Sequence, residues 1–152
     1  MSQSISRIGI DLAKNVFQVC TTDMSGNVLT NKKVSRKQLP EHIVYVPPCE
    51  VVMEACASAH YWARVFTRMG HKVKLIHPAY VRPYVKTNKN DAADAEALCE
   101  AASRPQMRFV QLSNRTSRHY TAFGSAWWHN VQAFVIRSGG YWENMALSFH
   151  WV

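Results

Sequence analysis

Four acidic side chains of this 152-residue chain are placed where carboxylates could do chemistry together. Asp11 and Glu54 each interrupt an apolar, strand-like run, and a buried carboxylate is costly unless it is paired or bound to a metal. Asp91 and Asp94 lie three residues apart at the start of a predicted helix, so their side chains share one face. If the four converged, their mutual repulsion would raise their pKa values unless cations lay between them.

Such a set of hard oxygen ligands suits Mg²⁺, with Mn²⁺ as the alternative. Two ions about 3.5–4 Å apart can activate an attacking oxygen and stabilise a leaving oxygen in phosphodiester chemistry. The residue types therefore predict a metal site that acts on nucleic-acid strands. Each residue alone also has a simpler explanation. Asp11 or Glu54 could form a strand-end hydrogen bond or an edge salt bridge, and the aspartate pair could interact with the helix N-terminus.

The basic residues favour an anionic partner. The chain has a net charge of +8 and a pI near 9.6, which makes nucleic acid the first candidate and a merely soluble basic protein the alternative. Cationic side chains near the acids would hold the phosphate backbone beside the metal. This role is assigned to Lys14, Arg82, Lys86 and Lys89.

The elements that must position these residues alternate between strand-like and helical patterns. Three closely spaced apolar runs predict an antiparallel meander, and a further strand, helix, strand and helix follow. Ser58 and Asn90 are the expected N-caps of the two longer helices, and Pro105 ends the second. The predicted strands cover residues 5–14, 16–23, 28–35, 49–56 and 71–78, and the predicted helices cover 37–45, 58–69 and 91–103.

This order predicts an α/β fold with a mixed sheet of about five strands flanked by helices. If the first and fourth strands adjoin, Asp11 and Glu54 approach each other at the carboxyl ends of those strands. Trp62 is expected in the core and His60 at a helix start, although both, with Tyr61, could instead stack on nucleic-acid bases.

The four cysteines form no CxxC pair and have no histidine at zinc-ligand spacing, which favours reduced thiols in a cytoplasmic protein. No signal peptide and no apolar run of membrane-spanning length is expected.

The chain changes character near residue 111. Residues 1–110 hold 15 Lys and Arg and 9 Asp and Glu, whereas residues 111–152 hold no lysine, one acid and four of the five tryptophans. The tail could be an aromatic-rich binding segment or disordered. A sharper hypothesis is a shifted reading frame: with plausible codons, HYTAFGSAWWHN (119–130) becomes ALHRVRERLVAQ one base back, which is a good amphipathic helix.

Three blocks in order, each carrying its acid, closely resemble the N-terminal domain of bacterial insertion-sequence transposases of the DEDD type, the IS110 family. The blocks are GIDLAKNVFQV, VVMEACASAHYWAR and KTNKNDAADAEALCEAASRPQMRFV, and together they cover roughly residues 5–110. The resemblance implies an RNase H-like fold related to the RuvC Holliday-junction resolvases. It also implies Mg²⁺ at a DEDD tetrad, here Asp11, Glu54, Asp91 and Asp94.

The resemblance further implies that family members cut and rejoin DNA, use a structured guide RNA and act as homo-oligomers. The full pattern adds a helical region and a domain with a nucleophilic serine, neither of which follows residue 110 here. We therefore expect an incomplete fragment, inactive alone in transposition. The alternatives are a non-catalytic DNA- or RNA-binding remnant, or a sugar-kinase or actin-like ATPase. The last is disfavoured because no glycine-rich phosphate loop follows Asp11.

Overall fold

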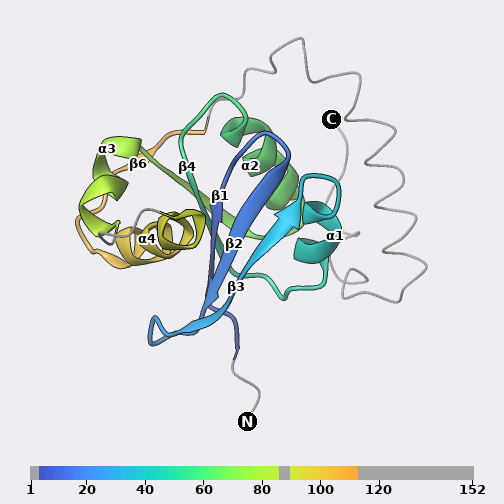
Figure 1. The fold of residues 1–152 in the computed structure, drawn as a ribbon, viewed down its shortest axis with the longest axis horizontal. Coiled ribbons are helices and arrows are strands. Elements are labelled where there is room, and N and C mark those ends of the chain that lie inside the picture. Colours follow the sequence, from blue (N-terminus) through green and yellow to red (C-terminus); the bar gives the residue numbers. More distant parts are fainter. Residues whose placement is uncertain (1–3, 86–89, 113–152) are drawn as a thin grey trace. The chain divides into compact units, whose positions relative to one another are not determined.

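One mixed sheet of six strands organises the described part of the protein (Figure 1). The computed structural model describes residues 4–85 and 90–112, all within the compact unit formed by residues 1–114. The strand order is β3-β2-β1-β4-β5-β6. The strands are β1 (Arg7–Asp11), β2 (Val16–Thr22), β3 (Val28–Ser35), β4 (Glu50–Glu54), β5 (Lys72–Ile76) and β6 (Phe109–Val110).

The first three strands form the predicted antiparallel meander. The turn between β2 and β3 depends on Gly26, which has a φ of 85°, and on Asp23, whose carboxylate accepts hydrogen bonds from the backbone of Ser25 and Asn27. β4 then pairs in parallel with β1, and β5 in parallel with β4. The first and fourth strands are therefore neighbours, which is the condition under which Asp11 and Glu54 were expected to approach each other.

The helices are α1 (Leu39–Val44), α2 (Ala59–Arg68), α3 (Pro78–Val81), the 3₁₀ turn η1 (Arg82–Tyr84) and α4 (Asp91–Ser103). Asn90 caps α4 as predicted, because its side chain accepts a hydrogen bond of 2.8 Å from the Ala93 amide. Ser58 lies at the predicted N-cap position of α2, but the expected side-chain capping bond is absent. Ser58 precedes α2 but has helical φ and ψ and makes no capping bond, and its hydroxyl lies 3.4 Å from the Cys56 sulfur instead.

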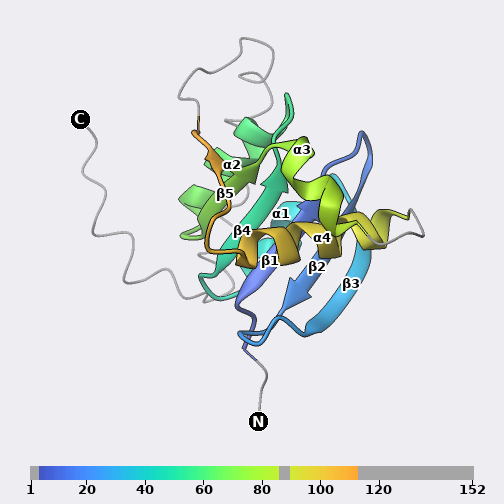
Figure 2. The same cartoon turned by 90° about the vertical axis from the view of Figure 1, so that its left-hand side faces the viewer.

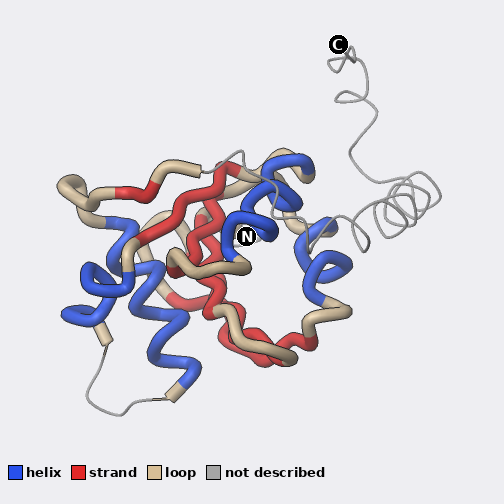
Figure 3. Tube along the Cα trace, turned by 90° about the horizontal axis from the view of Figure 1, so that it is seen from above, coloured by secondary structure: helices blue, strands red, loops and turns tan. Residues whose placement is uncertain are grey.

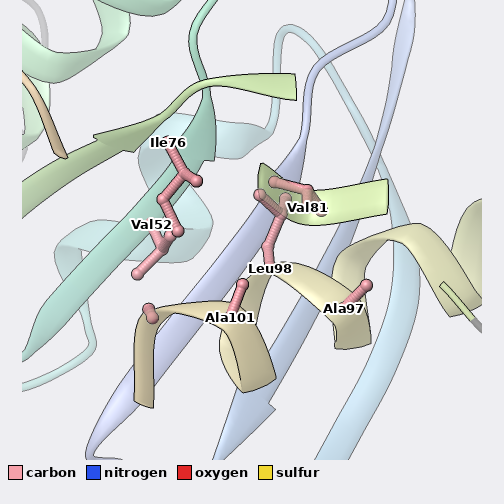
Figure 4. Packing of buried hydrophobic residues seen from close by; sticks show 7 residues of the cluster. Val52, Ile76, Val81, Ala97, Leu98 and Ala101 are labelled. Carbon is pink, nitrogen blue, oxygen red and sulfur yellow. The ribbon is translucent and has the colours of Figure 1, made fainter. Parts of the chain in front are cut away.

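Helices cover both faces of the sheet (Figure 3). On one face, Trp62 of α2 is buried and packs edge-on against Phe17 of β2, so its predicted place in the core is confirmed. On the other face, α4 runs across the strands (Figure 2) and contacts β1 and β2 most extensively. Its apolar side packs Leu98 and Ala101 against Val52 and Ile76 of the central strands (Figure 4).

Sequence periodicity predicted the main elements but missed three short ones, β6, α3 and η1. Strand β6 has only two residues and pairs antiparallel with β5 through Leu75 and Ile76. Helix α3 has four residues and begins at Pro78, with His77 as its side-chain cap. Segments as short as these show no repeating apolar pattern.

Candidate metal centre

The β1–β4 register brings Asp11 and Glu54 to the same end of the sheet. Ile10 is paired with Met53, so Asp11 and Glu54 occupy the next positions on two adjacent parallel strands. Gly9 and Val52, two residues earlier in each strand, both face α4. Because side chains alternate across a strand, Asp11 and Glu54 point to the α4 face as well.

The first turn of helix α4 lies at this end of the sheet, where β1 and β4 terminate. Its N-terminus carries Asp91 and Asp94, and its middle lies in direct contact with β1. The contact is closest at Gly9, where an added Cβ would lie 2.5 Å from the carbonyl oxygen of Ala95. Only glycine permits this approach, which occurs two residues before Asp11.

The electrostatics of Asp11 reflect the other three acids. The pKa of Asp11 is raised from 3.8 to about 6, first by burial of its carboxyl group and then by the negative charges of Asp94, Glu54 and Asp91. The four predicted acids therefore lie close enough to interact through their charges. Asp11, Glu54 and Asp94 are partly buried, whereas Asp91 is exposed.

The side chains do not converge on one point in the described part of the chain. Asp91 forms an ion pair of 2.9 Å with Lys33 of β3. No hydrogen bond or ion pair to another described residue engages the carboxylates of Asp11, Glu54 or Asp94. Within residues 4–85 and 90–112, no three acidic, histidine or cysteine side chains are grouped closely enough to hold a metal ion.

This donor set nevertheless fits a divalent ion in kind. Carboxylate oxygens are the ligands that Mg²⁺ prefers. A bound cation would relieve the repulsion among the carboxylates of Asp11, Glu54 and Asp94, which have no partner among the described residues. Ligation would require these carboxylates to move closer together than they lie in the described structure. For Asp91 ligation also means leaving Lys33.

The predicted nucleic-acid-binding residues are only partly within the described ranges. Lys14 is exposed in the loop that follows β1, at the same edge of the sheet as Asp11. Arg82 is exposed in η1, which packs against α4. Lys86 and Lys89 lie outside the described residues, so their role stays a prediction.

Sequence reasoning missed three polar residues near the acids. Besides Lys33, these are Gln18 of β2 and Asn31 of β3, which hydrogen-bond to each other at 2.7 Å. Gln18 is only 5% exposed, and its position inside the apolar run VFQVC was the available signal. A buried amide in a strand, like a buried carboxylate, needs an explanation.

Away from the acids, His71 and Cys49 contact each other. Nδ1 of the buried His71 accepts a hydrogen bond from the Cys49 amide and lies 3.6 Å from the Cys49 sulfur. Burial raises the pKa of the Cys49 thiol to about 12, so this thiol is a poor nucleophile and a poor metal ligand at neutral pH. None of the four cysteines forms a disulfide in the described structure. No helix in the described ranges has the length and apolar character needed to cross a membrane.

Comparison with known proteins gives a consistent result. A family model for DEDD transposases of the IS110 type, described as "Transposase", matches residues 8–145. A probable family 20 transposase of Pseudomonas aeruginosa is 46% identical over 135 residues, which is 89% of this chain and 38% of that protein. The transposase for insertion sequence element IS1328 of Yersinia enterocolitica is 53% identical over 134 residues, 88% of this chain and 39% of that protein.

The chain thus spans about two fifths of the length of these relatives. The family match also continues beyond residue 110, where the three sequence blocks end, so the similarity is longer than the sequence reading recognised. The reading frame of residues 111–152 stays a prediction. Among solved structures, T. thermophilus RuvC in complex with Holliday junction substrate has a TM-score of 0.50 and 13% identity. The match covers 68% of this chain and 98% of that one, and it supports the RNase H-like fold.

Proposed function

Because this chain belongs to the IS110-type DEDD transposase family, we propose that it carries a metal-dependent DNA-cleaving centre formed by Asp11, Glu54, Asp91 and Asp94. The observation that carries the proposal is the meeting of two strand ends and one helix start. Asp11 and Glu54 end adjacent parallel strands, and α4 brings two further carboxylates close enough to raise the pKa of Asp11.

Each acid has a distinct part in the proposed site. Asp11 and Glu54 are fixed by the central strands, so they would provide the rigid side of a Mg²⁺ or Mn²⁺ site. Asp94 would complete it from α4, and Asp91 would join after releasing Lys33. Bound divalent ions would activate the attacking oxygen and stabilise the leaving oxygen of a phosphodiester.

The partner in this proposal is DNA. Lys14 lies just beyond the Asp11 strand end, and Arg82 lies in the turn that leads toward Lys86 and Lys89. The charges of these four residues would neutralise backbone phosphates without reading sequence. A guide RNA, a homo-oligomer and a serine nucleophile in longer relatives remain predictions from the family resemblance.

One observation favours the second candidate function, a DNA- or RNA-binding domain without cleavage. Asp91 is paired with Lys33, and the described acidic side chains are not gathered at ligand distance. If this arrangement persisted in the presence of divalent ions, the basic residues would bind phosphates, but the four acids would not form a metal site. Strand cleavage separates the two functions.

The test uses the purified full chain with a radiolabelled branched DNA and with a linear duplex, in Mg²⁺, in Mn²⁺ and in EDTA. The proposal expects divalent-dependent cleavage that is abolished by Asp11→Asn and by Glu54→Gln. Both substitutions remove a charge and preserve side-chain size. Glu41→Gln, an exposed acid of α1, is the matched control and should cleave like the parent.

Circular dichroism and a gel-shift titration accompany each variant. Binding with no cleavage in either metal would support the non-catalytic alternative. Cleavage that persists in both Asp11→Asn and Glu54→Gln would show that these carboxylates do not form the centre.

A further inference from the structure

A partly buried polar network ties the acidic turn of α4 to β2 and β3. Gln18 Nε2 donates to Asn31 Oδ1 at 2.7 Å. Asn31 Nδ2 in turn donates to the Ala92 carbonyl oxygen and to Glu96 Oε1, both at 3.0 Å. Ala92 lies between Asp91 and Asp94, so the network is hydrogen-bonded to the turn that carries both aspartates.

The chemistry of the partners fixes the orientation of both amides. A backbone carbonyl and a carboxylate only accept hydrogen bonds, so the nitrogen of Asn31 must face Ala92 and Glu96. The oxygen of Asn31 therefore faces Gln18, and Gln18 must present its nitrogen to it. Gln18 Oε1 is left over, buried and without a donor among the described residues.

This unpartnered oxygen belongs to the residue opposite Asp11. The register pairs Gln18 with Asp11 on one side and with Lys33 on the other, so the three side chains stand in one row on the α4 face. Buried polar atoms in native proteins nearly always have a partner, so an acceptor that lacks one calls for a donor at the site. Asp11 as a carboxylate has no proton to give.

We propose that Gln18 is a positioning residue of the carboxylate site. Through Asn31 it holds the first turns of α4 against β2 and β3. When a divalent ion is bound, Oε1 of Gln18 would accept a hydrogen bond from a water molecule of that ion. Mg²⁺ keeps several waters when protein carboxylates bind it, and each of these waters is a hydrogen-bond donor. The inference rests on the proposed metal site, and it adds an outer partner that the four acids do not include.

The first experiment measures Mg²⁺ and Mn²⁺ affinity of the metal-free full chain by isothermal titration calorimetry. Loss of an outer-shell partner typically weakens metal binding by roughly 10- to 100-fold, and this is expected for Gln18→Met. Thr21→Val is the matched control. Thr21 is the buried residue three positions further along β2, on the opposite face, and its hydroxyl pairs with Thr30 of β3 at 2.8 Å.

The second experiment measures hydrogen exchange of the α4 amides, which reports positioning without reference to activity. Asn31→Ala leaves Gln18 in place but removes the link to α4, so it should speed exchange in residues 91–96 and weaken Mg²⁺ binding about tenfold. Thr21→Val should leave that exchange unchanged. Asn31→Ala also decides the matter if Gln18→Met does not fold, as circular dichroism would reveal.

The outcomes separate this inference from the proposed function. If Asp11→Asn abolishes Mg²⁺ binding but Gln18→Met and Asn31→Ala bind like the parent, the Gln18 inference is overturned and the metal site stands. If the parent binds no divalent ion, or if Asp11→Asn binds as well as the parent, the proposed metal site fails and the inference fails with it.

Discussion

The substitution Gly9→Ala tests how α4 is held over the acidic edge of the sheet. The added Cβ would lie 2.5 Å from the Ala95 carbonyl oxygen and 2.8 Å from the Cys99 sulfur, whereas ordinary contact begins at 3.4 Å. The helix backbone would therefore have to retreat by about 0.9 Å, the difference between 3.4 and 2.5. Overpacking of this kind typically lowers the free energy of unfolding by about 1–3 kcal/mol.

Urea unfolding followed by circular dichroism measures the first consequence. A loss of about 2 kcal/mol moves the midpoint to lower urea by roughly 1–2 M for a small domain. The second consequence is electrostatic. A retreating α4 exposes Asp11 and carries Asp94 away from it, so the raised pKa of Asp11 should fall toward its ordinary value of 3.8. Carbon-detected NMR of the Asp11 carboxyl group follows that titration.

Gly26→Ala is the matched control. Gly26 has a φ of 85° and no neighbour within 4 Å of an added Cβ, so its replacement costs about 1–2 kcal/mol through backbone strain alone. It should leave the titration of Asp11 unchanged. Adding Cys99→Ala to Gly9→Ala should recover only part of the stability, because the clash with the Ala95 backbone remains. An unchanged midpoint and an unchanged Asp11 titration in Gly9→Ala would refute the close-packing argument.

Three further predictions follow from the charges. Burial and neighbouring acids raise the pKa of Asp11 to about 6, so the folded chain binds more protons than the unfolded chain between pH 3.8 and 6. The metal-free protein should therefore lose stability through this group as the pH rises across that window, and Asp94→Asn should move the NMR titration of Asp11 to lower pH. Lys33→Met removes an exposed ion pair with the first carboxylate of α4, and such pairs contribute up to about 1 kcal/mol. It should strengthen Mg²⁺ binding by at most about fivefold in calorimetry, and weaker binding would contradict a competing role for Lys33. Glu50→Ala leaves the partly buried Arg7 and Lys74 without the carboxylate that each contacts at 2.6 Å. It should lower the free energy of unfolding in urea by about 2–3 kcal/mol. Glu100→Ala, in an exposed pair, should cost less than about 0.5 kcal/mol, and equal losses would show that burial is not what matters.

Much of the fold could be predicted because its elements are long enough to show their periods. Apolar alternation marked β1 to β3, and the Asn90 cap with the run that ends before Pro105 marked α4. The Ser58 cap could not be judged from sequence, because a capping serine and a serine already in helical conformation look alike. Strand β6 is defined by its pairing with β5, and no local sequence pattern predicts that pairing.

The candidate site divides in the same way. The sequence singled out the four acids as candidates because a carboxylate in an apolar strand, or a pair at helical spacing, is unusual in its local context. Gln18 and Gly9 were missed as site residues because their importance depends on the partner across the strand or across the helix interface. Sequence alone named the side chains that are candidate metal ligands, since that choice depends on residue type and spacing along the chain. Only the tertiary structure decided that Asp11 and Glu54 end neighbouring strands, that α4 lies close enough to raise the pKa of Asp11, and that Lys33 holds Asp91, since those contacts join residues far apart in the chain.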